Sequence, residues 1–184
     1  NCTSSNNWYG LHIVSSTNNT VLNSTFNQNT ITNAFIAEGA AGNIKYNAFT
    51  NAGSVGLMFS NFDYANVSHN LFENNICYGM HLAYLSTGSW IHHNAFISNN
   101  LGGVQAFDDT YSLNKWDDHW NMEGNYWDDH VSGNYTLDGA WKVNDTYPLN
   151  SIPPGVFEFT KLTYIILLVP VVFVSSLIIR KRKK

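Results

Sequence analysis

Acidic, imidazole and indole side chains gather near the carboxyl end of the chain in a repeated tetrapeptide. Trp-Asp-Asp-His occurs twice, at residues 116–119 and 127–130, and nine of the 13 acidic residues lie between Asp108 and Asp145. Carboxylate oxygens are the ligands that Ca²⁺ prefers, and a mixture of carboxylate and imidazole suits Zn²⁺ or Cu²⁺. The pattern indicates a candidate metal site for Ca²⁺ or Cu²⁺. Its candidate ligands are Asp117, Asp118, His119, Asp128, Asp129 and His130.

A second pair of possible metal ligands is His69 with His93. Each lies three positions before a phenylalanine, so the two occupy equivalent places in the repeat described below and are expected to be neighbours. Two imidazoles do not specify a metal, and Asn23 and Tyr46 hold the same place elsewhere in the chain. We therefore favour an ordinary solvated surface for this column, with a metal site as the alternative.

Carboxylates could also catalyse polysaccharide cleavage. Hydrolysis needs two carboxylates about 5 to 9.5 Å apart, and Asp108, Asp109 and Glu73 are the candidates. Alternation along a strand points Asp108 and Asp109 to opposite faces, so these two do not form such a pair. Lyase chemistry on uronates needs a cation, yet residues 1–160 hold no Arg and only three scattered Lys. We expect a non-catalytic module, with a glycoside hydrolase or lyase as the alternative.

Several Asn-X-Ser/Thr sequons mark possible glycosylation sites if the chain is exposed at a cell surface. Residues of a turn or loop are better acceptors than residues of a packed strand, which favours Asn134 over Asn66. The candidate acceptors are Asn134, Asn144 and Asn18.

A repeat of roughly 23 residues, a period typical of solenoid proteins, must position these groups. Alignment on Phe26, Phe49, Phe72 and Phe96 gives spacings of 23, 23 and 24. Each unit holds an alternating apolar triplet, as in residues 11–13, which is typical of a strand with one buried face. Such a unit cannot close a sandwich alone, but stacked coils bury each column against itself at about 4.8 Å. The sequence predicts an all-β, right-handed parallel β-helix of about five coils.

The coil model predicts four inward columns. In the fifth coil it places Val104 beside Met80 and Ala106 beside Leu82. The columns are Leu11, Ala34, Leu57, Met80, Val104; Ile13, Ile36, Phe59, Leu82, Ala106; Val21, Ile44, Val67, Ile91; and Phe26, Phe49, Phe72, Phe96.

A cap offers a second explanation for the acidic segment. The last coil of a solenoid is open and needs a cover, and large aromatic side chains can lie across it while their acidic neighbours stay in water. We favour this explanation over a metal site. The covering residues would be Trp116, Trp120, Tyr126, Trp127 and Trp141.

The chain ends in an uncharged segment from Leu162 to Ile179, followed by five basic residues. Eighteen residues at 1.5 Å rise give roughly 27 Å, enough for a transmembrane helix, and the positive-inside bias places the basic tail in the cytoplasm. A cleaved C-terminal sorting signal is the alternative. The predicted division is coils at 1–113, continuing N-terminally in a longer chain, a cap at 114–149, a linker at 150–161, the membrane helix at 162–179 and the tail at 180–184.

Charge narrows the choice of partners. Residues 1–160 carry three Lys, no Arg and 13 acids, a net charge of 3 − 13 = −10. A surface this acidic disfavours nucleic acid and anionic lipid, and it suits cations or neutral sugars.

Two sets of residues resemble a known family. Gly10-Leu11-His12-Ile13 together with Asn70-Leu71-Phe72 resembles right-handed parallel β-helix repeat proteins. The ending, at residues 114–117, 124–129 and 145–149, resembles the terminal signature of NosD-type proteins. That family is named for a periplasmic copper-binding accessory protein of nitrous oxide reductase and is common among archaeal surface proteins. The resemblance covers residues 10–149.

These observations together favour a membrane-anchored module outside the cell or in the periplasm, with a structural role or a role in carbohydrate and cell-surface recognition. Its expected partners are the membrane, through Leu162 to Ile179, and glycans or other surface proteins. The resemblance implies one alternative, a NosD-like accessory protein that binds copper or another metal. A polysaccharide-processing enzyme is the second alternative.

Overall fold

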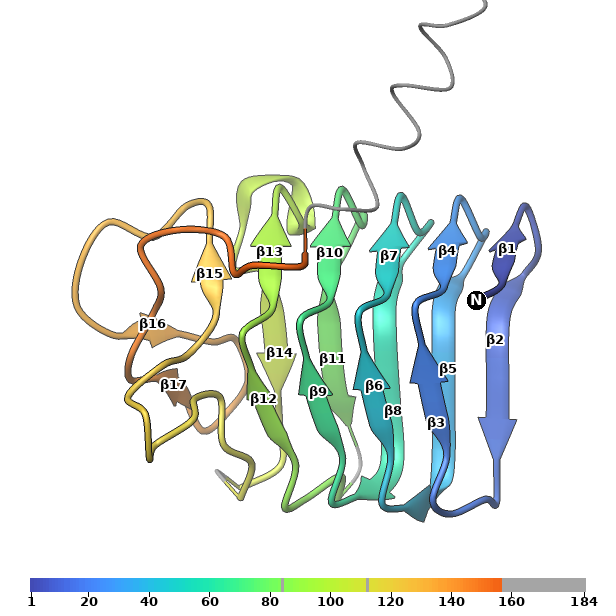
Figure 1. The fold of residues 1–184 in the computed structure, drawn as a ribbon, viewed down its shortest axis with the longest axis horizontal. Coiled ribbons are helices and arrows are strands. Elements are labelled where there is room, and N and C mark those ends of the chain that lie inside the picture. Colours follow the sequence, from blue (N-terminus) through green and yellow to red (C-terminus); the bar gives the residue numbers. More distant parts are fainter. Residues whose placement is uncertain (84, 112, 157–184) are drawn as a thin grey trace, which may run out of the picture.

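The computed structural model describes residues 1–83, 85–111 and 113–156. The chain winds into a parallel β-solenoid of about five turns, in which successive turns add strands to three parallel sheets (Figure 1). The predicted all-β repeat fold is confirmed. The described residues contain no α-helix.

The three parallel sheets run along the length of the solenoid. Sheet A consists of β1 (Thr3–Ser5), β4 (Thr25–Asn27), β7 (Ala48–Thr50), β10 (Leu71–Glu73), β13 (Ala95–Ile97) and β15 (Tyr126–Trp127). Sheet B consists of β2 (Tyr9–Val14), β5 (Thr32–Ala40), β8 (Val55–Asp63), β11 (Met80–Ala83) and β14 (Ala106–Asp108). Sheet C consists of β3 (Thr20–Leu22), β6 (Asn43–Lys45), β9 (Asn66–Ser68) and β12 (Trp90–His92).

Phenylalanines stack inside the solenoid because the strands of sheet A pair in register. Phe26, Phe49, Phe72 and Phe96 are paired in sequence along the sheet, and their ring centroids are 5.3, 5.2 and 4.7 Å apart. All four rings are buried. Because neighbouring parallel strands lie close together, in-register pairing brings a phenylalanine of each coil into contact with that of the next. The same residue type is therefore needed once per coil, and the repeat is visible in the sequence.

The strand register predicted for the fifth coil is wrong. Ala106 pairs with Met80 and Asp108 pairs with Leu82, so the pairing is shifted by two positions from the sequence alignment. A short 3-10 helix, η1 (Asn100–Gly102), occupies the turn before this coil and takes up the additional length. Val104, predicted beside Met80, instead packs at the border of the core.

The end of the described chain returns along the outside of sheet A (Figure 1). Val156 is buried in a small apolar cluster with Ala48, Leu71 and Ala95, and Ile152 packs against the same cluster. Residues 150–156 of the predicted linker therefore cover outward-facing side chains of β7, β10 and β13.

The predicted membrane segment, Leu162 to Ile179, and the basic tail lie outside the described residues. Within the described part, no helix has the length and apolar character that a membrane crossing requires.

Candidate functional site

The carboxyl end of the solenoid is closed by a cap that extends the aromatic stack. Trp127 of β15 stacks on Phe96 at 4.2 Å, and Tyr135 stacks on Trp127 at 4.0 Å. Tyr135 lies in β16 (Tyr135–Thr136), which pairs antiparallel with β17 (Asn144–Asp145). Trp116 is also buried against Phe96, with ring centroids 6.2 Å apart.

A row of asparagine side chains runs parallel to the phenylalanine stack. The Oδ1 atom of Asn70 accepts the backbone N–H of Asn47 at 2.9 Å and its Nδ2 group at 3.0 Å, and Asn94 does the same for Asn70 at 3.0 Å each. Asn125 continues the row, accepting the backbone N–H of Asn94 at 3.1 Å and its Nδ2 group at 2.9 Å. Along the row, each backbone N–H and each Nδ2 group donates to the Oδ1 atom of the next member, so the last member, Asn125, requires an acceptor beyond the final coil.

Asp145 supplies that acceptor. Its Oδ2 atom accepts the backbone N–H of Asn125 at 2.7 Å and the indole N–H of Trp127 at 2.9 Å, and its Oδ1 atom accepts the N–H of Tyr147 at 3.1 Å. Burial raises the pKa of Asp145 to about 6, although these donors act in the opposite direction.

Two other polar rows end in carboxylates in the same way. Asn75 donates to Asn99, Asn99 donates to Gln105, and the Gln105 amide donates to Asp128 at 2.7 Å and to Asp129 at 2.8 Å.

The third row ends at Asp108 in the fifth coil. Ser89 donates its N–H to Asn114, and the side chains of Asn114, Thr110 and Trp116 donate to the buried Asp108, the indole at 2.8 Å.

The two Trp-Asp-Asp-His segments therefore have different surroundings. In the second segment, Asp128 and Asp129 accept hydrogen bonds from Gln105, and the ring of His130 lies 6.1 Å from that of Tyr135.

In the first segment, Asp117 is buried and accepts the N–H of Thr146 at 3.3 Å. Asp118 accepts the Nδ2 group of Asn121 at 2.6 Å, and His119 is exposed, with its ring 6.2 Å from that of Tyr147.

His69 and His93 are neighbours on adjacent coils, as the repeat predicts. Their rings are parallel, with centroids 5.2 Å apart. The Nδ1 atoms of His92 and His93 lie 2.6 Å apart, and His93 Nε2 lies 2.7 Å from Glu123 Oε2. Burial, and to a lesser degree the charge of His93, lower the pKa of His92 to about 4. Each ring nitrogen of His93 thus already has a hydrogen-bond partner, Nδ1 with His92 and Nε2 with Glu123.

The carboxylates considered for hydrolysis do not face one another. Asp108 is buried as described above, whereas Asp109 is exposed and accepts the N–H of Ala140 at 3.1 Å. Glu73 ends β10 in sheet A, where burial and the nearby Asp128 raise its pKa.

The three sequon residues predicted as glycan acceptors, Asn18, Asn134 and Asn144, are all exposed. Asn66, in contrast, is half-buried in β9, and its Oδ1 atom is buried. Glycosylation itself stays a prediction.

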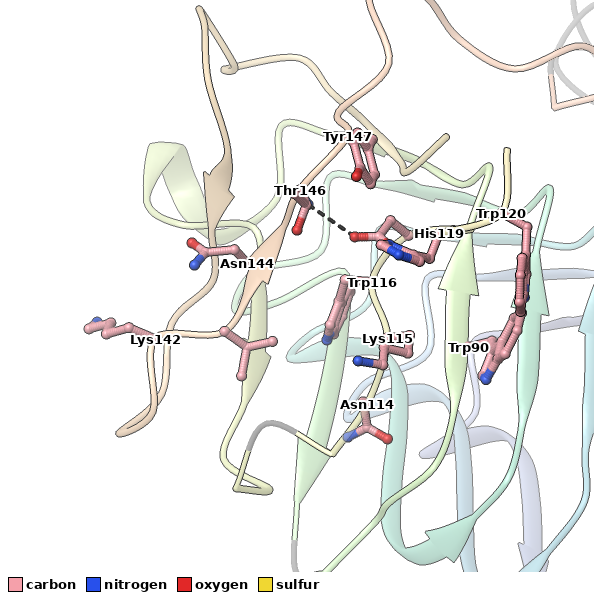
Figure 2. Close-up of a pocket in the computed structure, with 12 residues that line it drawn as sticks. Trp90, Asn114, Lys115, Trp116, His119, Trp120, Lys142, Asn144, Thr146 and Tyr147 are labelled. Carbon is pink, nitrogen blue, oxygen red and sulfur yellow. Dashed lines mark hydrogen bonds between the residues drawn. The ribbon is translucent and has the colours of Figure 1, made fainter. Parts of the chain in front are cut away.

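A groove of about 600 Å³ lies between the end of sheet C and the cap. Figure 2 shows Trp90 and Trp120 on one side of it, Lys142 and Asn144 on the other, and Lys115 between them. The lining residues are Trp90, Asn114, Lys115, Trp116, Asp117, His119, Trp120, Lys142, Val143, Asn144, Thr146 and Tyr147.

Regular backbone pairing positions the inner side of the groove. Trp90 is paired with Lys115, and the N–H of Ile91 donates to the Lys115 carbonyl at 2.7 Å. Because Ile91 points into the core, Trp90 points outward and remains 42% exposed.

Trp120 lies on the loop that leaves the coil after Lys115 and rejoins it at Gly124. It is 81% exposed, and its N–H donates to Asp118 Oδ1 at 3.2 Å. The side chain of Asp118, one of the predicted metal ligands, thus stabilises the loop that carries Trp120.

Sequence reasoning did not identify this groove. Trp116 and Trp120 were expected to cover the core together, but only Trp116 is buried, with 1% of its surface exposed. Lys115 and Lys142 lie far apart in the sequence, and no periodic pattern relates them. The sequence held one usable signal, the Asn-Lys-Trp segment at residues 114–116. Alternation along a strand that buries Asn114 and Trp116 must expose Lys115.

The comparisons with known proteins agree with this architecture. The family model described as "Periplasmic copper-binding protein (NosD)" matches residues 1–132. The chain belongs to the NosD family. No curated protein and no solved structure matches the chain. The NosD match spans the coils and β15, whereas residues 142–147, which form one side of the groove, lie beyond it.

The NosD description raises the question of a copper site. Imidazole suits copper, and His69, His92 and His93 are close neighbours. However, His92 and His93 face one another through Nδ1, and Glu123 occupies the remaining nitrogen of His93. Among the described residues, no group of three or more His, Cys, Asp or Glu side chains is arranged to hold a metal ion. The residues as they stand do not fit a copper centre.

Proposed function

We propose that this NosD-family chain is a carbohydrate-recognition module whose binding site is the groove beside the cap. The supporting observation is a pair of exposed indoles, Trp90 and Trp120, in a groove that also offers amide, ammonium and hydroxyl groups. The apolar C–H face of a pyranose ring packs on an indole, while its hydroxyls need directional polar partners.

The groove is suited to binding rather than to chemistry. The groove lining holds one carboxylate, that of Asp117, which is 7% exposed and accepts a backbone N–H. The lining therefore does not supply the pair of carboxylates that hydrolysis needs. We therefore propose recognition without turnover, with residues 162–179 as the membrane anchor of a module that faces the cell exterior or the periplasm.

Binding of the 184-residue chain, held in detergent micelles, to an array of oligosaccharides tests this function. Replacing Trp120 with Ala, and separately Trp90 with Ala, should each weaken binding by about tenfold or more, because aromatic anchors carry much of the energy of such sites. Glycans incubated with the protein should be recovered without cleavage.

Trp8 provides the matched control. It is 72% exposed and lies in the first coil, at the opposite end of the solenoid from the groove. Replacing Trp8 with Ala should leave glycan binding unchanged. Equal affinity in the Trp8 and Trp120 variants, or an absence of glycan binding in the unmodified chain, would overturn the proposed function.

A further inference from the structure

The groove holds an unusual share of the positive charge of the described chain. Residues 1–156 contain 12 acidic residues, three Lys and no Arg, a net charge of 3 − 12 = −9 with histidine neutral. Two of those three lysines, Lys115 and Lys142, line the groove. The lining holds one acid, Asp117, so its formal charge is 2 − 1 = +1. A positive groove on a strongly acidic surface concentrates anionic ligands there and excludes them elsewhere.

The backbone of Lys115 is fixed while its side chain is exposed. The N–H of Lys115 donates to Ser89 at 2.8 Å, and its carbonyl accepts the N–H of Ile91 at 2.7 Å, so both sides of the residue are held by the preceding coil. Within the described residues, the Lys115 ammonium has no carboxylate within 4.0 Å. Figure 2 shows it between the two exposed indoles and the strand that carries Asn144.

Lys142 adds a second cation at the rim of the groove. Its Nζ atom lies 3.1 Å from Asp138 in an exposed pair. An exposed pair of this kind contributes little energy, so Lys142 can turn toward a bound anion at small cost. The single acid of the groove lining, Asp117, is buried and accepts the N–H of Thr146, and it offsets only one of the two lysine charges.

We infer that the ligand of this groove is an acidic saccharide, one whose sugar ring carries a carboxylate or sulfate. This inference rests on the proposed carbohydrate function and specifies its ligand class. The ring lies against Trp90 and Trp120, and the anionic substituent at its edge reaches the Lys115 ammonium. A neutral sugar would find the same indoles but would leave the ammonium without a partner. The net charge of residues 1–160 predicts neutral sugars or cations as partners, and the proposed ligand departs from that prediction because two of the lysines line this groove.

Pairs of oligosaccharides that differ only in charge test the inference. The probes are oligogalacturonate with its methyl ester, and a sulfated dextran oligomer with its unsulfated parent, each titrated into the 184-residue chain in detergent. In the pairs that bind, the acidic member should bind about fivefold more tightly, a difference typical of one partly exposed ion pair. The preference should decline as the salt concentration rises, because salt screens the charges.

Lys115→Met removes the ammonium and keeps most of the apolar stem, so it should lower the preference for the acidic member from about fivefold to about twofold or less, and Lys142 at the rim accounts for the remainder. Lys45→Met is the matched control, since Lys45 lies in β6, outside the groove lining, and the preference should survive its replacement. Circular dichroism of both variants establishes that they remain folded.

The outcomes separate the two proposals. Equal binding of both members to the unmodified chain, with loss of binding in the Trp120 variant, would overturn the acidic ligand and keep carbohydrate recognition. A preference for the acidic member that is undiminished in the Lys115→Met variant would also overturn the inference. Binding of neither member of any pair would overturn both proposals.

Discussion

Replacement of Asn70 by Ala tests whether the asparagine row supports the fold. Its Oδ1 atom accepts two hydrogen bonds from Asn47, and its Nδ2 group donates to Ile44 O at 2.8 Å, Ser68 O at 3.1 Å and Asn94 Oδ1 at 3.0 Å. Alanine removes all five bonds and leaves the buried N–H of Asn47 without the acceptor that the structure gives it. An orphaned buried donor costs about 2 kcal/mol and each other lost bond about 0.5 kcal/mol, so unfolding should become about 4 kcal/mol easier.

Two measurements check this magnitude. Chemical denaturation gives the free energy of unfolding, and amide hydrogen exchange should show that the N–H of Asn47 loses its protection. Asn43→Ala is the control, because Asn43 is exposed in β6, and its replacement should change stability by less than about 0.5 kcal/mol. A loss below about 1 kcal/mol for Asn70→Ala, with the Asn47 amide still protected, would refute the structural role of the row.

Two further predictions concern the core and the cap. Phe72→Ala, which removes a buried ring stacked on two others, should lower the free energy of unfolding by about 3 to 5 kcal/mol, measured against the half-buried Phe107→Ala; equal losses would refute the stack. Burial raises the pKa of Asp145 from 3.8 to about 6, so its contribution to stability is present below pH 3.8 and is lost as pH rises through 6, a change of about 3 kcal/mol. Asp145→Asn should remove this part of the pH dependence of denaturation, and parallel curves for the two proteins would contradict it.

The periodic part of the molecule could be predicted from the sequence, because residues that lie one period apart in a solenoid sequence pack against one another on adjacent coils. Phe49 and Phe72 lie one period apart in the sequence and therefore stack in register. The prediction failed at Val104 and Ala106, where η1 breaks the period and shifts the pairing by two positions. When a turn changes length, the alignment of repeats does not show how many residues the turn has taken up, so the register of the following strand cannot be predicted from it.

The cap could be predicted only in outline. The composition indicated aromatic residues over an open coil, and Trp116 and Trp127 are buried there. The same composition also indicated a metal site, because the residue type of Asp128 does not reveal that its carboxylate accepts an amide from Gln105. Likewise Lys115 and Lys142 line the same groove because of the non-repetitive path of the cap, which no spacing rule describes. Hydrogen-bond geometry, rather than residue type, separates these roles.

The shared direction of the asparagine row has a consequence for how proteins of this kind can change in length. Each coil receives from the preceding coil the same donors that it passes to the next, so a coil inserted or removed between Asn47 and Asn94 would leave the hydrogen bonds of this row satisfied. The carboxylate of Asp145 cannot be used in this way, because it accepts and donates nothing onward. The hydrogen bonding of the row therefore sets no limit on the number of coils, whereas the terminal acids and indoles must remain together at the end.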